Sequence, residues 1–297
     1  MRACAPLRSA AATGLSAASF KVLHQDECVL RYDAASQIAI LSMERHARKN
    51  AIGVGFLNCI QQAIDVCRAG APSGACTTAS ADCPPVRCLV VSSAVPKVFC
   101  AGADLKERKE MSVAESRAFV QRLRQTFNDL EDLPIATIAA IEGKALGGGM
   151  ELALSLDMRV AGDGATVGFP ETGLGIIPGA GGTVRAPAAL GVSRALELIL
   201  TAQQVSARRA VELGIVNRVV PAGSALEAAL DLALRISKNG PLAVCAAKKA
   251  VRSAVGKTRA EAMQVEAEQY EVVLATEDRL EGLKAFAEHR TPLYKGK

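Results

Sequence analysis

Hydrophobic residues recur at two different periods along this chain, which predicts a mixed α and β protein. Nearly continuous apolar runs cover residues 37–43 and 87–93, and each has the length of a buried strand. Residues 53–68 instead space their apolar side chains for one face of a helix, at Phe56, Leu57, Ile60, Ile64 and Cys67. Strand and helix patterns that alternate in this way are typical of a β/α core.

The same alternation continues through the middle of the chain. An amphipathic helix is predicted over 112–131, and Pro134 opens a strand over 135–141. Two shorter strands are expected near 158–161 and 165–169. These segments extend the predicted core.

Helical patterns dominate the C-terminal part of the sequence. They begin near Ser193, and the only strand-like break that follows lies at 215–220. Residues 223–297 are predicted to be helix alone. We therefore expect an α/β core over 26–222 and a C-terminal helical segment over 223–297.

The composition limits the classes of function. The chain has 297 residues, half of them hydrophobic, so it can bury a large core. Aromatic residues make up only 3% and there is no Trp, so stacking platforms for single-stranded nucleic acid are scarce. No apolar run reaches membrane-spanning length.

Cysteine and histidine usage does not indicate a metal site. The nine cysteines include no Cys-x-x-Cys pair, which is typical of reduced thiols in a matrix or cytosolic protein. We expect each cysteine to act as a small buried hydrophobe. The three histidines are far apart in the sequence and form no His-Glu-x-x-His unit, so no metal is expected.

The positive charge is concentrated near the N-terminus. The formal net charge is +5, and Arg2, Arg8 and Lys21 precede the first acidic residue, Asp26, so the rest carries +2 (5 − 3). This leader bears arginine, is rich in Ser and Ala and lacks acids, which is the profile of a mitochondrial transit peptide. We therefore expect a leader over 1–25 and a matrix location, the alternative being an uninformative tail.

Two glutamates lie in glycine-rich, apolar surroundings. Glu151 follows three consecutive glycines, Gly147 to Gly149, and Glu171 comes twenty residues later (171 − 151). A carboxyl group that loses its water is easier to protonate. Two such groups facing one pocket could exchange protons with a substrate.

The glycines do not form a nucleotide-binding motif. Gly-x-Gly-x-x-Gly fails because Pro178 stands at the third glycine position counted from Gly173, and the phosphate-binding loop fails because Val251 precedes Gly256-Lys257. A helix that starts at the glycine triplet instead offers unpartnered N–H groups and a positive dipole end. One such donor aimed at a developing oxyanion contributes about 3–4 kcal/mol to transition-state stabilisation.

A second donor is expected in the loop after the strand at 87–93. Asp104 and Glu107 have the spacing of a capping pair that begins a helix. The N–H of Ala103 would then lie just before the cap and could point inward.

Three sequence blocks together resemble the enoyl-CoA hydratase/isomerase (crotonase) superfamily. They are residues 99–106, 141–154 and 170–183, and residues 278–286 are similar to the trailing helix of that superfamily. The resemblance extends from about residue 25 to the C-terminus. Within the superfamily, the chain is most similar to the mitochondrial methylglutaconyl-CoA hydratase branch, notably at Ala101 to Arg108 and at Arg290 to Gly296.

The resemblance implies a fold and a reaction. The fold would be a spiral of β-β-α turns whose C-terminal helices mediate homotrimers, commonly paired as homohexamers. The reaction would be addition of water to a 2-enoyl-CoA thioester. It needs no metal or redox cofactor, because coenzyme A is part of the substrate.

The resemblance also implies roles for individual residues. Glu151 and Glu171 would hold one water between them; Glu151 would take its proton, and Glu171 would supply a proton to the α-carbon. The N–H groups of Ala103 and Gly148 would hold the thioester oxygen. Coenzyme A would be bound near Lys106, Ala101, Asp104 and Leu105.

Each of these residues has a simpler reading when it is taken alone. Glu151 could merely favour a helix N-terminus, Glu171 could be an exposed loop residue, and Lys106 a solvated charge. Only the joint pattern favours a CoA-thioester site.

Alternatives to hydration remain at this stage. A Δ3,Δ2-enoyl-CoA isomerase shares the fold but typically keeps one of the two acids. An RNA-binding protein is a second alternative, since RNA binding through a lysine-rich helix is known in that branch. The corresponding stretch, Gly53 to Ala69, holds only Arg68 as a cation. An inactive paralogue is a third.

Several positions depart from the superfamily pattern. His289 replaces a frequent lysine, Val184 a usual glutamine and Ala188 a frequent arginine, so CoA affinity and acyl specificity are open. Residues 69–85, rich in Gly, Ser, Thr, Ala and Pro, are expected to be an inserted exposed loop.

Overall fold

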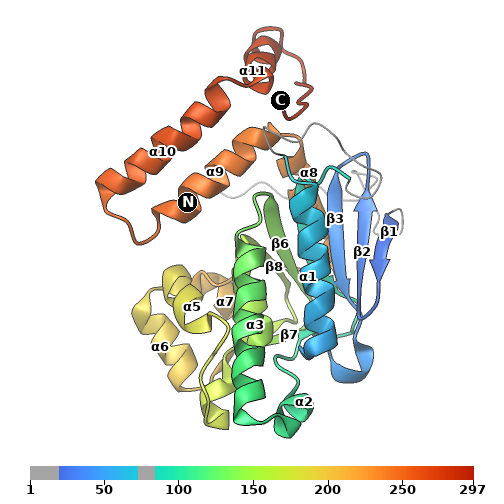
Figure 1. Ribbon diagram of the computed structural model, residues 1–297, viewed down its shortest axis with the longest axis vertical. Helices are drawn as coiled ribbons and strands as arrows, with labels where there is room; N and C mark the ends of the chain where they lie inside the picture. Colours follow the sequence, from blue (N-terminus) through green and yellow to red (C-terminus); the bar gives the residue numbers. More distant parts are fainter. Residues whose placement is uncertain (1–19, 73–83) are drawn as a thin grey trace.

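The computed structural model describes residues 20–72 and 84–297 and contains two β-sheets with helices around them (Figure 1). The larger sheet has seven strands in the order β1-β2-β3-β4-β6-β8-β11. Their bounds are Lys21–Gln25, Cys28–Asp33, Ile38–Met43, Cys88–Ser93, Ala136–Ile141, Met158–Gly162 and Arg218–Val220. The strands predicted over 37–43, 87–93 and 135–141 are thus confirmed as β3, β4 and β6.

The centre of the large sheet is parallel and covered on both faces. β3, β4, β6, β8 and β11 pair in parallel, whereas β1, β2 and β3 form an antiparallel meander. All residues of β3 and β6 are buried. Burial on both faces explains why these strands are continuous apolar runs without alternation.

Alternate residues of the sheet pack into two separate hydrophobic clusters. Leu41 and Val91 face the cluster that contains α1 (Val54–Ala69) and α3 (Val113–Glu131). Ile40 and Val90 face the opposite cluster, which contains α8 (Ala225–Ser237). Because side chains alternate across a strand, α8 completes the core although it lies within the predicted C-terminal segment.

A second, smaller sheet organises the loops beyond the core. Its order is β10-β9-β7-β5, with bounds Gln204–Ser206, Thr166–Gly168, Lys144–Leu146 and Val98–Cys100. β5, β7 and β9 run parallel to one another. The loops that follow these three strands therefore leave the same edge of the sheet, where α/β proteins commonly carry function.

Shorter helices surround this small sheet. They are α2 (Leu105–Glu110), α4 (Gly148–Ser155), α5 (Gly182–Leu190), α6 (Val192–Leu200), α7 (Ala207–Leu213) and the short 3-10 helices η3 (His46–Arg48) and η4 (Pro170–Leu174). The helix predicted over 112–131 is confirmed as α3, and Ser112 and Glu115 form a capping box at its start.

The C-terminal helices project from the core (Figure 1). α9 (Pro241–Ala254), α10 (Arg259–Leu274) and α11 (Glu277–Ala287) follow α8. The prediction of helix alone over 223–297 is wrong for residues 288–297, which have no regular structure. Asp278 accepts backbone N–H bonds from Lys295 and Gly296, so side-chain contacts hold this end instead.

Two predictions lie partly or wholly outside the described residues. Residues 1–19 and 73–83 fall there, so the leader and most of the inserted loop stay predictions. β1 occupies residues 21–25, the end of the range expected for the leader. A leader that ends before Lys21 would leave the large sheet complete.

Candidate active site

The first turn of α4 is where the predicted site residues meet. Gly147, its N-cap, adopts φ +54° and ψ −123°, a backbone conformation that side chains strongly disfavour. A Cβ at this position would also lie 2.7 Å from Oε1 of Glu171. The absence of a side chain thus lets the Glu171 carboxyl group reach the α4 N-terminus.

The two predicted oxyanion donors are neighbours. A Cβ placed on Gly148 would lie 3.4 Å from the nitrogen of Ala103, and one on Gly102 would lie 3.4 Å from the nitrogen of Gly148. Ile52 holds the loop around Ala103, because it donates to the Gly102 carbonyl (2.7 Å) and accepts from the Asp104 N–H (3.0 Å). In the described chain neither the Ala103 nor the Gly148 N–H has a protein acceptor.

The Glu151 side chain is buried, and one of its two carboxylate oxygens accepts hydrogen bonds. Its side chain is on α4, with 2% exposure, and Oε1 accepts N–H bonds from Ala180 (2.8 Å) and Gly182 (2.7 Å). Burial raises the pKa of Glu151, while these two N–H donors and the charges of Arg185 and Arg124 oppose the rise. Among the described residues Oε2 accepts no hydrogen bond, so this oxygen is available to a ligand or water.

Of the two glutamates, Glu171 has more of the properties expected of a proton donor. It lies in η4 with 8% exposure, and its Oε2 is buried without a protein partner. Burial raises the pKa of Glu171 to about 7, and the negative charge of Glu151 adds to the rise. A carboxyl group that titrates near neutral pH can give and take protons at the pH at which many enzymes work.

The capping prediction for α2 is half right. Asp104 caps the helix and accepts from the N–H groups of Lys106 (3.1 Å) and Glu107 (3.4 Å). Glu107 does not return the bond to Asp104. Its carboxylate instead accepts from the N–H of Val54 (3.1 Å) and from Arg45 (2.8 Å), because α1 begins beside it.

Arg45 joins the loops that carry the Ala103 donor. Its guanidinium contacts Asp104 (3.0 Å), Glu107 (2.8 Å) and Glu27 (2.8 Å). The Asp104 carboxylate is therefore occupied by structural contacts, so any contact of this residue with coenzyme A would come from its backbone. The other residues expected near coenzyme A are exposed beside it: Ala101 in the loop before α2, and Leu105 and Lys106 in the first turn of α2.

Asn50 supports the same region from within the core. It is fully buried with φ +53°, a conformation that Asn tolerates better than most residues. Its amide donates to Ser93 Oγ (2.8 Å) and the Phe99 carbonyl (2.9 Å), and it accepts from the Arg45 N–H (2.9 Å). Neither Arg45 nor Asn50 belongs to a local sequence motif, so neither could be identified from the sequence.

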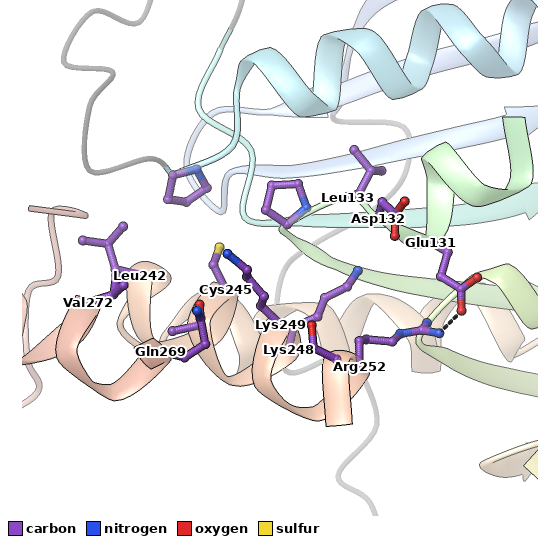
Figure 2. Close-up of a pocket in the computed structure, with 14 residues that line it drawn as sticks. Glu131, Asp132, Leu133, Leu242, Cys245, Lys248, Lys249, Arg252, Gln269 and Val272 are labelled. Carbon is purple, nitrogen blue, oxygen red and sulfur yellow. Dashed lines mark hydrogen bonds and ion pairs between the residues drawn. The ribbon is translucent and has the colours of Figure 1, made fainter. Parts of the chain in front are cut away.

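Two cavities lie elsewhere, between the core and α9. Figure 2 shows the one between residues 131–133 and α9, about 380 Å3 in volume. Glu131 pairs with Arg252 there, and Cys245, Lys248 and Lys249 line its α9 side. Glu151 and Glu171 line neither cavity. In the part of the chain that the structure describes, no cluster of His, Cys, Asp or Glu could hold a metal ion, and no helix could span a membrane.

The structure also shows where the cysteines lie and where the three positions that differ from the superfamily pattern lie. Val184, Ala188 and His289 are all exposed. Among the six described cysteines, only Cys245 is partly exposed and five are buried, namely Cys28, Cys59, Cys67, Cys88 and Cys100. The prediction that cysteines act as buried hydrophobes is confirmed for those five.

Comparison with known proteins gives consistent matches. The family described as Enoyl-CoA hydratase/isomerase matches residues 33–297. The chain is 45% identical over 261 residues to "Probable enoyl-CoA hydratase 2, mitochondrial" of Arabidopsis thaliana, which covers 88% of this chain and 82% of that protein. It is 39% identical over 284 residues to "Methylglutaconyl-CoA hydratase, mitochondrial" of Mus musculus, covering 94% and 86%.

A solved structure extends the likeness to three dimensions. The crystal structure of an enoyl-CoA hydratase from Bacillus anthracis superposes with a TM-score of 0.84 at 40% identity. The match covers 92% of this chain and all of that one. The likeness therefore includes the core and the C-terminal helices.

Proposed function

The chain is an enzyme of the enoyl-CoA hydratase/isomerase family, and on that premise we propose that it adds water across the 2,3 double bond of a 2-enoyl-CoA thioester. The observation that carries the proposal is the pair of buried carboxyl groups, Glu151 and Glu171, at the same helix N-terminus as two unpaired N–H groups.

The chemistry follows from this arrangement. The N–H groups of Ala103 and Gly148 would bind the thioester oxygen and stabilise the negative charge that it gains. Glu151 Oε2 would accept a proton from water while the water oxygen bonds to the β-carbon. Glu171 would deliver its proton to the α-carbon as the double bond is lost, so atoms and charge balance.

Coenzyme A would lie over the loop that precedes and begins α2. Ala101, Leu105 and Lys106 are exposed there, next to the Ala103 donor. Lys106 offers a positive charge to the phosphates, and Leu105 offers apolar surface to the adenine. The coenzyme is substrate in this scheme, and no separate cofactor takes part.

Isomerisation of a 3-enoyl-CoA is the second candidate activity. It moves one proton between two carbons, for which a single carboxyl group suffices, whereas hydration needs an acceptor for the proton of water and a donor to carbon. The presence of two carboxyl groups with raised pKa values favours hydration. Separate assays of 2-enoyl-CoA hydration and 3-enoyl-CoA isomerisation decide between them.

The decisive experiment is steady-state hydration of a panel of enoyl-CoA thioesters. The panel contains short straight chains, branched chains and methylglutaconyl-CoA, the substrate class in the name of the mouse relative. Glu151→Gln and Glu171→Gln are each expected to lower kcat by at least about 100-fold, the smaller end of acid–base contributions. Wild-type turnover in either variant refutes the role of that residue, and an inactive wild type across the panel favours an inactive paralogue.

We also propose a homotrimer or homohexamer. Exposed apolar side chains on the C-terminal helices support it, with exposures of 61% for Leu280, 58% for Leu283 and 83% for Phe286. Light scattering coupled to size-exclusion chromatography measures the oligomeric state; a monomer would contradict the proposal.

A mitochondrial matrix location agrees with the basic, acid-free leader and with the mitochondrial relatives. RNA binding is disfavoured, because Arg68, the one cation in α1, contacts Asp65 and Asp129. Import assays with and without residues 1–19 test the location, and a gel-shift titration with AU-rich RNA tests the other function.

A further inference from the structure

Arg185 occupies a buried position behind the proposed catalytic pair. It lies on α5 with 8% exposure. Its guanidinium makes three separate hydrogen bonds: to Glu131 (2.6 Å), to Asn128 (2.7 Å) and to the carbonyl oxygen of Ala180 (3.0 Å). Glu131 and Asn128 belong to the last turn of α3, so Arg185 connects that helix to the loop before α5.

The same loop holds Glu151. The N–H of Ala180 donates to Oε1 of Glu151, and the N–H of Gly182 donates to the same oxygen. Ala180 is thus held by Arg185 on its carbonyl side while its own N–H orients the glutamate. The loop includes Gly181 at φ +107°, and a Cβ there would clash with the Arg185 guanidinium, so the absence of a side chain lets Arg185 reach the loop.

We propose that Arg185 is a positioning residue for Glu151, which it orients through Ala180. The inference rests on the proposed function, since it gives Glu151 the role of proton acceptor. Within the described residues, Arg185 makes no hydrogen bond or ion pair to Ala103, to Gly148 or to residues 101–106.

The charged groups around Glu151 set the expected pH effect. Arg185 on α5, Arg124 on α3 and Glu171 in η4 face it, and Arg124 also donates to the Gly179 carbonyl (3.0 Å). The two arginines lower the pKa of Glu151 against the effect of burial. Loss of Arg185 should therefore raise this pKa further. Because Glu151 must be ionised to accept a proton, activity should then begin at a higher pH.

The test compares Arg185→Met and Arg185→Lys with a matched control, Arg252→Met. Arg252 on α9 pairs with the same Glu131, as Figure 2 shows, and with Asp157 (2.9 Å). It makes no hydrogen bond to the loop that holds Glu151. Both methionine variants remove a buried or half-buried cation from the Glu131 network, but only one of them removes the contact to Ala180.

Arg185→Met is expected to lower kcat by about 10- to 100-fold, as small displacements of a catalytic group do. KM should change by less than about three-fold, because the substrate contacts are intact. The acidic limb of the kcat/KM profile should move to higher pH, because the positive charge that lowers the pKa of Glu151 is lost. Arg185→Lys should lose kcat but keep the acidic limb, and Arg252→Met should keep both.

A readout without turnover separates this inference from the proposed function. Infrared titration of the Glu151 carboxylate, taken as the difference from Glu151→Gln, should show a higher pKa in Arg185→Met than in wild type. If wild type hydrates no enoyl-CoA, the proposed function fails while this titration still tests Arg185. If the titration and kcat of Arg185→Met match wild type, or Arg252→Met shows the same losses, the positioning role is refuted. Should Arg185→Met not fold, Arg185→Lys decides by the loss or retention of kcat.

Discussion

Glu171 should destabilise the folded protein at the pH at which it is proposed to work. Glu171→Gln removes the titration and keeps the shape of the side chain. Its Oε2 is buried without a protein partner, so ionisation in the folded state is unfavourable. The substitution should therefore stabilise the fold at alkaline pH while it abolishes most of the activity.

The magnitude follows from the pKa. Burial raises the pKa of Glu171 from 4.5 to about 7. Between these values the folded state binds more protons than the unfolded state, so wild-type stability falls as pH rises through this window. A difference of about 2.5 units corresponds to about 3 kcal/mol in full, and to about 2.5 kcal/mol between pH 5 and pH 8.

The assay is urea denaturation of wild type and Glu171→Gln at pH 5 and pH 8, at one protein concentration because an oligomer gains stability with concentration. The stability advantage of the variant should be about 2.5 kcal/mol larger at pH 8 than at pH 5. Any cost of burying the amide is the same at both pH values and cancels. An advantage that does not change with pH would refute the idea that burial, felt in the folded state, raises this pKa.

Three further predictions concern the same site. Gly147→Ala should lower the rate of hydration by at least about 100-fold, because the added Cβ would meet the Glu171 carboxyl group. The backbone conformation of this residue costs alanine about 1–3 kcal/mol, and thermal unfolding should show that loss of stability. Wild-type kinetics would contradict the prediction. Arg45→Met should destabilise the fold by about 3 kcal/mol in urea titrations, the lower end for a broken buried ion pair, since the buried Asp104 keeps only the more distant Arg48 (3.9 Å) as an ion-pair partner. A change below about 1 kcal/mol would contradict it. The kcat/KM of wild type should fall above about pH 7 as Glu171 loses its proton, and below a lower pH as Glu151 gains one; activity that stays flat to pH 9 would argue against Glu171 as the proton donor.

The sequence predicted the parts of the fold whose evidence is local. Strands β3, β4 and β6 are buried on both faces, and helices α1 and α3 have one apolar face, so short windows contain the whole pattern. The short strands β8, β9 and β11 were also predicted, near 158–161, 165–169 and 215–220, whereas β1, β2, β5, β7 and β10 were missed. β5 and β7 have three residues each and are strands only because they pair with each other and β7 pairs with β9.

The candidate site, too, could be predicted from the sequence only in part. The glycine triplet and the two glutamates could be identified from the sequence, because their residue types and their order along the chain are unusual. The sequence did not reveal that Glu107 would bind Val54 and Arg45 rather than close a capping box. That outcome depends on where α1 begins relative to α2, which no local pattern records.

By itself, then, the sequence determined the longer strands and helices of the core, and it identified the two glutamates and the glycines that bring chemistry. Only the tertiary structure decided that the loops after β5, β7 and β9 meet at one sheet edge, and that Arg185 reaches the loop that holds Glu151. The physical reason is the range of the interactions. Periodicity and capping act between neighbours in the chain, whereas burial, pKa shifts and ion pairs depend on groups that only folding brings together.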